Sequence, residues 1–177
     1  GVQNDIDISM RQVLKTKEKT LIAEKCSQHI QSGDSIFLDG STTCWFVARQ
    51  LANKNLTVLT TSLQIATILA ASPTISLILI GGAFSPKSMA FLGDNACRAL
   101  SNYYVDKAFI SCRSVSMENG LTDVSEGEAA IHRLITQRSN RTYLVVDHSK
   151  VGPTSFAFAC GLDSIDAMIC DKPLPQE

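Results

Sequence analysis

Short apolar runs alternate with amphipathic segments along most of this chain. The apolar runs are three to eight residues long and end at small or polar residues, which is typical of buried β-strands. They predict strands at residues 36–38, 56–60, 75–80, 104–111, 142–146 and 166–170. Apolar positions spaced three or four apart predict helices at residues 17–31, 44–51, 65–70, 94–101 and 126–138.

Three regions lack either pattern. Residues 83–92 are expected to be irregular, and residues 113–125 to form a long polar connection with a turn at Asn119-Gly120. Residues 1–15 mix apolar and polar positions, which favours a linker or a strand-like arm. The 177 residues suit one domain with a substantial core, and we place that domain at residues 16–177.

Helical crossovers between successive strands predict an α/β fold with a mostly parallel sheet flanked by helices. Ligands of such sheets bind at the carboxyl ends of the strands. Three of the predicted strands end in small or hydroxyl-bearing residues, at 39–43, 61–62 and 81–82. We therefore expect these three ends to converge on a binding site.

The segment Asp39-Gly40-Ser41-Thr42-Thr43 joins a predicted strand to a predicted helix. The first N–H groups of a helix lack partners, and together with the helix dipole they attract an anion. The three hydroxyl groups would add donors around a phosphate. Ser and Thr are also preferred as ordinary helix N-caps, and one hydroxyl suffices for that role. Three hydroxyl groups beside a glycine favour the anion site.

Composition narrows the functional classes. The net charge is −1, so the whole chain has no general attraction to nucleic acid or to a membrane surface, and an acidic ligand must be captured locally. No apolar run approaches the roughly 20 residues needed to cross a bilayer, and the polar N-terminus does not resemble a signal peptide. Six cysteines lie mostly in apolar runs without metal-ligand spacing, so we expect reduced thiols, no metal and a cytoplasmic location.

Several ordered motifs resemble the C-terminal sensor domain of the DeoR family of bacterial transcriptional regulators. The resemblance runs in register from about residue 17 to residue 171. It rests on Asp39-Gly40-Ser41-Thr42-Thr43, Thr60-Thr61-Ser62, Gly81-Gly82, Gly93, Asp106-Lys107-Ala108-Phe109, Gly120-Leu121-Thr122, Glu128-Ala129-Ala130 and Asp147-His148-Ser149-Lys150. Several motifs in one order are more specific than any one of them.

This resemblance implies a fold like that of ribose-5-phosphate isomerase, glucosamine-6-phosphate deaminase and the CoA transferases. It implies that the chain senses a phosphorylated sugar or related metabolite, without a cofactor, for a repressor of sugar metabolism genes. DNA would be bound only through a separate N-terminal helix-turn-helix domain, with residues 1–15 as the arm that joins it. We also expect a homo-oligomer and no membrane partner.

The resemblance and the strand ends together predict the ligand-binding residues. These are Asp39, Gly40, Ser41, Thr42, Thr43, Thr61, Ser62, Gly81, Gly82, Arg113, Glu128 and Lys150. Thr61 stands where the family often has Asn, and Arg113 lies where small residues are usual. Arg113 could hold a phosphate or could crowd the pocket, so both departures leave the choice of sugar open.

Most of these residues also have an ordinary structural interpretation. Lys150 could contact a phosphate or could be a solvated loop lysine. Asp39 could orient sugar hydroxyl groups or fix the turn backbone, and Glu128 could accept from the sugar or favour the helix dipole. Gly81 and Gly82 could admit a ligand or only form a turn.

An isomerase or deaminase on the same fold is one alternative function, and a dimerisation module with a vestigial pocket is another. The enzyme would need a base with a pKa near neutral. Backbone donors around Asp39 would lower its pKa, which leaves Glu128 without a clear acid partner. We therefore predict no catalytic residues and a sensor rather than an enzyme.

Overall fold

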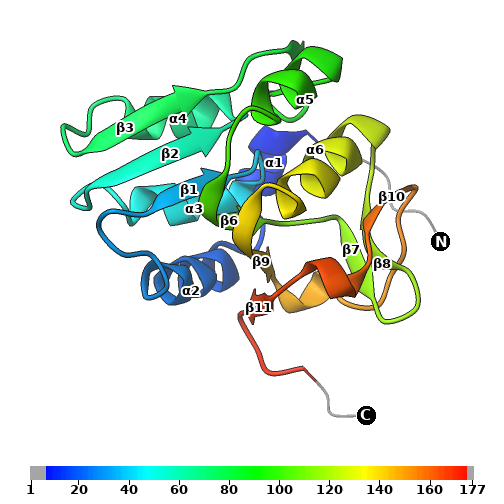
Figure 1. Ribbon diagram of the computed structural model, residues 1–177. Helices are drawn as coiled ribbons and strands as arrows, with labels where there is room; N and C mark the ends of the chain where they lie inside the picture. Colours follow the sequence, from blue (N-terminus) through cyan, green and yellow to red (C-terminus); the bar gives the residue numbers. More distant parts are fainter. Residues whose placement is uncertain (1–6, 175–177) are drawn as a thin grey trace.

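A six-stranded parallel sheet forms the centre of the computed structural model, which describes residues 7–174 (Figure 1). Its strand order is β11-β9-β6-β1-β2-β3. These strands are β1 (Ser35–Leu38), β2 (Leu56–Thr60), β3 (Ile75–Leu79), β6 (Val105–Ile110), β9 (Ser139–Val146) and β11 (Ala167–Cys170). Each matches one of the six predicted strands, and every neighbouring pair is parallel, so the predicted α/β fold is confirmed.

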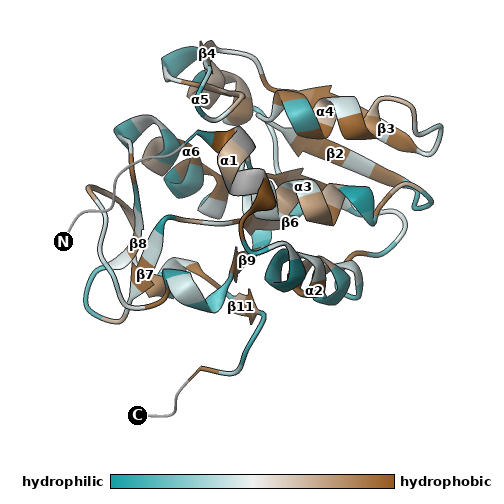
Figure 2. Cartoon of the chain, turned by 180° about the vertical axis from the view of Figure 1, so that it is seen from behind, coloured by the Kyte–Doolittle hydropathy of each residue, from teal (hydrophilic) through white to brown (hydrophobic). Residues whose placement is uncertain are grey.

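Helices cover both faces of this sheet (Figures 1 and 2). On one face lie α1 (Ile8–Val13), α2 (Thr16–Ser27), α3 (Thr42–Arg49) and α4 (Leu63–Leu69). On the other lie α5 (Asp94–Leu100) and α6 (Glu126–Thr136), which contact each other. Each of the five predicted helices corresponds to one of these, with ends that differ by a few residues.

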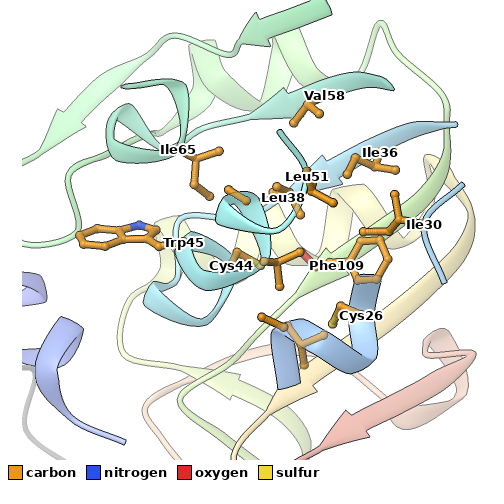
Figure 3. Close-up of a cluster of buried hydrophobic side chains, with 14 of the residues drawn as sticks. Cys26, Ile30, Ile36, Leu38, Cys44, Trp45, Leu51, Val58, Ile65 and Phe109 are labelled. Carbon is orange, nitrogen blue, oxygen red and sulfur yellow. The ribbon is translucent and has the colours of Figure 1, made fainter. Parts of the chain in front are cut away.

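The strand β1 is apolar at successive positions because both of its faces are buried. Ile36 and Leu38 point into one buried cluster with the helices α2 to α4, shown in Figure 3, and Phe37 points into a second cluster with α5 and α6. All three side chains are fully buried. Because a sheet with helices on both faces buries both sides of each strand, its strands lose the usual alternation of apolar and polar residues.

Two predictions of irregular structure were wrong. Residues 83–92 contain an antiparallel hairpin of β4 (Ala83–Ser85) and β5 (Ala90–Leu92). Residues 113–125 contain β7 (Ser114–Ser116) and β8 (Gly120–Asp123), which join β10 (Ala157–Cys160) in a small antiparallel sheet. These strands have only three or four residues, too few to display a period of two. Two short 3₁₀ turns, η1 (His148–Lys150) and η2 (Leu162–Ser164), complete the elements.

The predicted arm at residues 1–15 is described only in part, because residues 1–6 lie outside the described residues. Its remainder contains the helix α1, whose first residue Ile8 is buried in the core next to α3. Between residues 7 and 174, no helix combines the length and the apolar character that crossing a membrane requires.

Candidate functional site

A cavity lies at the carboxyl ends of the two central strands, β1 and β6. Residues 39–41 after β1, residues 111–113 after β6 and Thr61 after β2 form part of its lining. The remainder comes from the β4–β5 hairpin, the end of β8, the helix α6 and the turn η1. In the sheet, β2 and β3 lie on one side of β1, whereas β6, β9 and β11 lie on the other side of β1. The cavity therefore occupies the point where the strand order reverses, the usual ligand position in open α/β sheets.

The turn after β1 is built around the Asp39 carboxylate. The backbone N–H of Ser41 donates to Asp39 Oδ1 at 3.0 Å, and the Ser41 hydroxyl donates to the same oxygen at 2.5 Å. The Ser41 oxygen also accepts from Cys44 N–H at 3.2 Å and thereby caps α3. The structure thus contains both the turn-fixing aspartate and the N-cap serine that were predicted as the ordinary interpretations.

A buried ionic network extends this turn across the floor of the cavity. His132 Nε2 donates to Asp39 Oδ2 and His132 Nδ1 donates to Asp123 Oδ2, each at 2.8 Å. Ser111 N–H donates to Asp39 Oδ2 at 2.7 Å. Asp39, Asp123 and His132 are all buried, and they join the ends of β1 and β8 to α6.

The network fixes the charges of its members. Burial would raise the pKa of Asp39, but the hydrogen bond and charge of His132, together with Ser41 and Ser111, lower that pKa to about 2. Burial would lower the pKa of His132, but the charge and hydrogen bonds of Asp123 and Asp39 raise it well above its ordinary value of 6.5. At neutral pH the network therefore holds an imidazolium between two carboxylates.

Two cationic side chains face the same cavity. Arg113 lies directly after β6, and its N–H donates to Thr122 C=O of β8 at 3.1 Å. Lys150 lies on η1 after β9, and its N–H donates to Asp147 C=O at 3.1 Å. Both side chains are half-buried, as is Glu128 in the first turn of α6. The cavity thus presents two positive charges and one further carboxylate beside the internally paired network.

The structure brings seven of the predicted binding residues together. The cavity lining contains Asp39, Gly40, Ser41, Thr61, Arg113, Glu128 and Lys150. Thr42 and Thr43 lie just outside it, buried on the first turn of α3. Their backbone N–H groups have no hydrogen-bond acceptor within residues 7–174, as is usual for the first turn of a helix.

The other three predicted residues are not part of the cavity lining. Ser62 is fully buried and its hydroxyl oxygen caps α4 by accepting from Ile65 N–H. Gly81 and Gly82 follow β3, which lies two strands from β1, or about 10 Å at the usual strand spacing. The missing side chain of Gly82 admits other parts of the protein, because a Cβ there would lie 2.7 Å from Leu92 C=O.

Nine residues of the cavity lining were absent from the predicted set, among them the polar residues Ser88, Asp123 and His132. Ser88 and Asp123 lie on or beside strands that the sequence pattern did not predict. His132 could have been found, because it lies four residues after Glu128 on the same helix and therefore on the same helical face. His132 reaches the strand ends from α6, where its ring bonds to Asp39 after β1.

This arrangement suits binding better than proton transfer. Asp39 is a weak base at neutral pH because of its low pKa, and its two oxygens already accept four hydrogen bonds. A protonated His132 has no free lone pair to accept a proton. Glu128 is thus the remaining candidate base, as the sequence indicated.

Metal and thiol chemistry have little support. Among residues 7–174, no group of three or more His, Cys, Asp or Glu side chains is arranged to hold a metal ion. All six cysteines are free thiols. Burial raises the pKa of Cys112, the cysteine in the cavity lining, well above its ordinary value, so this thiol is not activated.

Comparison with known families identifies the class of protein. The family model described as the DeoR C terminal sensor domain matches residues 14–172. This chain belongs to that family, so the predicted resemblance is confirmed.

Named relatives point to the same kind of protein. The chain is 36% identical over 172 residues to an uncharacterized HTH-type transcriptional regulator, YulB, of Bacillus subtilis (strain 168), covering 97% of this chain and 67% of that protein. It is 29% identical over 166 residues to the glycerol-3-phosphate regulon repressor of Escherichia coli (strain K12), covering 93% and 66%. The chain thus spans about two thirds of these relatives, which are named as regulators and not as enzymes. We class the chain with them as a non-enzyme.

Solved structures support the fold. Ribose 5-phosphate isomerase A of Methanocaldococcus jannaschii matches with a TM-score of 0.55 and 18% identity, over 76% of this chain and 53% of that one. At this identity the likeness concerns architecture alone, and it agrees with the fold that the sequence motifs implied.

Proposed function

We propose that this chain is the effector-sensing part of a transcriptional repressor of sugar metabolism genes. A phosphorylated sugar or related metabolite binds in the cavity at the ends of β1 and β6. DNA is bound by a helix-turn-helix part of the longer protein, and the regulator acts in the cytoplasm as a homo-oligomer. The E. coli relative is named as the repressor of the glycerol-3-phosphate regulon, and glycerol 3-phosphate is a phosphate ester of the proposed ligand class.

One observation carries the proposal: two cationic side chains, Arg113 and Lys150, line a cavity at the carboxyl ends of the strands. The carboxylates Asp39 and Asp123 in the same lining are already hydrogen-bonded to His132, so the side chains that can attract an anion are the two cations. The N-cap of α3, Ser41, belongs to the same turn. The next two N–H groups, those of Thr42 and Thr43, have no acceptor among the described residues and could donate to an anion. Glu128 and Thr61 supply polar atoms for sugar hydroxyl groups.

A paired ligand screen tests the proposal. Ribose 5-phosphate, glucose 6-phosphate, fructose 6-phosphate and glycerol 3-phosphate are compared with their unphosphorylated counterparts by thermal shift and calorimetry. A ligand at 100 times its Kd should stabilise the protein by about 2.7 kcal/mol, or roughly 5–10 °C in Tm for a chain of this size. Equal binding of a sugar and its phosphate would contradict a phosphate site.

Lys150→Ala should weaken binding of the phosphosugar about tenfold or more, because a hydrogen bond between charged groups is lost. It should also reduce the salt dependence of binding. Lys17→Ala, at an exposed position on α2, is the matched control and should leave affinity unchanged. If both variants bind as the unmodified chain does, Lys150 is an ordinary surface lysine and does not contact the phosphate.

A further inference from the structure

The turn between β4 and β5 contacts both the cavity and the first residue of α1. Ser88 of this turn lines the cavity. The preceding residue, Lys87, accepts a hydrogen bond through its C=O from Ile8 N–H at 3.0 Å. Cavity and α1 are therefore joined by two consecutive residues of one turn.

Ser88 has an unused hydrogen-bonding group. Its side chain is 5% exposed, and within residues 7–174 its hydroxyl has no hydrogen-bond partner. A buried hydroxyl without a partner is costly, and such groups in native proteins call for an explanation. A hydroxyl or phosphate oxygen of a molecule in the cavity would provide the partner, because a serine can either donate or accept.

The turn is anchored on its other sides. Met89 C=O accepts from Leu63 N–H at 3.0 Å, and Phe91 N–H donates to Thr61 C=O at 2.9 Å. Met89 has φ 50°, in the left-handed region that residues with a side chain rarely adopt. A conformation of this kind persists only because the surrounding contacts impose it, so a new contact at the adjacent Ser88 can alter the balance.

Packing couples the turn to α1 in a second way. Ile8 is almost fully buried in the cluster that also holds Trp45, and Met89 packs against the same cluster. Figure 3 shows the Trp45 indole in this cluster, and Figure 2 shows α1 beside α3. The first helix of the described residues therefore contacts the turn both by a backbone hydrogen bond and by packing.

We propose that Ser88 binds the ligand and that the β4–β5 turn transmits occupancy of the cavity to α1. The step rests on the proposed function, because it requires a ligand in the cavity. A ligand can shift α1 only by as much as it prefers one arrangement of the turn over the other. By the same linkage, loosening α1 must change the affinity for the ligand.

The experiment uses the 177-residue chain and each of the four phosphate esters above as the probe. Hydrogen exchange of residues 7–13 and the emission of Trp45, the single tryptophan, report on α1. In the unmodified chain, a bound phosphosugar should change the exchange of residues 7–13 several-fold. Ser88→Ala should weaken binding about 5- to 10-fold, the value of one hydrogen bond, and at saturation should abolish the response of α1.

Matched controls separate this effect from general damage. Ser85→Ala removes a hydroxyl from the same hairpin outside the cavity lining and should leave both readouts unchanged. Ser88→Ala should fold at least as stably as the unmodified chain without ligand, because it removes an unsatisfied buried group. If it does not fold, Ser88→Cys keeps the shape with a weaker donor and should give the same two losses.

Reciprocity provides an independent test at the other end. Ile8→Ala should lower phosphosugar affinity by about fivefold or more although Ile8 does not line the cavity. Val13→Ala, at an exposed position on the same helix, should not change the affinity. Both effects are measured by calorimetry at one salt concentration.

The outcomes distinguish the two proposals. If a phosphosugar binds the unmodified chain but residues 7–13 and Trp45 do not respond, or Ser88→Ala binds normally, the transmission is refuted and the sensing function stands. If no phosphosugar binds the unmodified chain, both proposals are refuted.

Discussion

Replacing His132 with alanine should destabilise the domain by about 3–5 kcal/mol near pH 7. That is the usual cost of removing one partner from a buried ion pair, because the remaining charge has neither water nor a counter-ion. Here two carboxylates are left, Asp39 and Asp123, and each lies 2.8 Å from the lost ring.

The two carboxylates are not affected equally. Asp39 keeps the donors of Ser41 and Ser111, so part of its stabilisation remains. Within the described residues, the Asp123 carboxylate has His132 as its one hydrogen-bond partner, so most of the cost arises there. Since domains are stable by about 5–15 kcal/mol, the loss is a large fraction of the total and lowers Tm by roughly 6–20 °C.

Urea unfolding followed by circular dichroism at pH 7 and pH 4 measures this loss. His148→Ala is the control, since His148 donates to Asp171 at 2.7 Å with its own side chain 34% exposed and that of Asp171 3% exposed. It should cost less than His132→Ala, because water reaches the His148 ring and Asp171 keeps the backbone N–H donor of residue 148 at 2.7 Å. The cost of His132→Ala should shrink at pH 4, because burial without the imidazolium raises the pKa of Asp39 and the variant then takes up a proton.

Either of two results would refute the charged network. One is a cost for His132→Ala no greater than that for His148→Ala. The other is a cost that is independent of pH, since a purely steric cavity left by the ring does not titrate.

Three further predictions concern the turn and its supports. Lowering the pH from 5 to 2 should remove about 2 kcal/mol of stability through Asp39, whose pKa falls from 3.8 to about 2 on folding, because the unfolded chain protonates first. Urea unfolding of Asp39→Asn should lack this component. Lys54→Met should lower the free energy of unfolding by about 1–2 kcal/mol relative to the control Lys17→Met, as measured by thermal unfolding. The Lys54 ammonium donates to the carbonyl groups of Ser27 and Ile30, at and just after the end of α2, each at 2.6 Å. Gly40→Ala should cost about 1–3 kcal/mol because its Cβ would lie 3.0 Å from Ala90 Cβ, and adding Ala90→Gly should restore the stability.

The large sheet could be predicted because burial on both faces leaves a strong signal. Each of its six strands contains a run of mostly apolar residues, and the intervening helices are long enough to show their period. The small sheet could not be predicted, because its strands are short and include polar residues such as Ser114 and Thr122, whose burial depends on partners far along the chain. The Ser155 N–H that donates to Thr122 Oγ1 is one such partner.

The lining of the cavity could be predicted where it follows from the parallel strands. Residues after β1, β2 and β6 converge because parallel neighbours end at one edge of the sheet. Gly81 and Gly82 do not join them, because they follow β3, whereas the cavity lies at the ends of β1 and β6. The apolar runs predict that the strands exist but not the order in which they lie in the sheet. Asp123 and His132 were missed because their contact depends on how β8 and α6 pack together.

Asp39 connects the parallel strands, which the sequence predicted, to the helix α6, whose packing it did not predict. Its N–H donates to Phe109 C=O at 3.3 Å, which continues the pairing of β1 with β6, and its side chain then holds the turn, the start of the segment after β6, and α6. A carboxylate with four donors has little capacity left for a sugar hydroxyl group, so the residue most prominent in the sequence motif acts mainly by positioning others. The groups better suited to bind are Ser88, whose hydroxyl has no hydrogen-bond partner among residues 7–174, and the cationic side chains that line the cavity. Substitution of Ser88, Arg113 or Lys150 should therefore change the relative affinities for different phosphosugars. Substitution of Asp39 should lower the stability of the domain and should change the affinity for all ligands by the same factor.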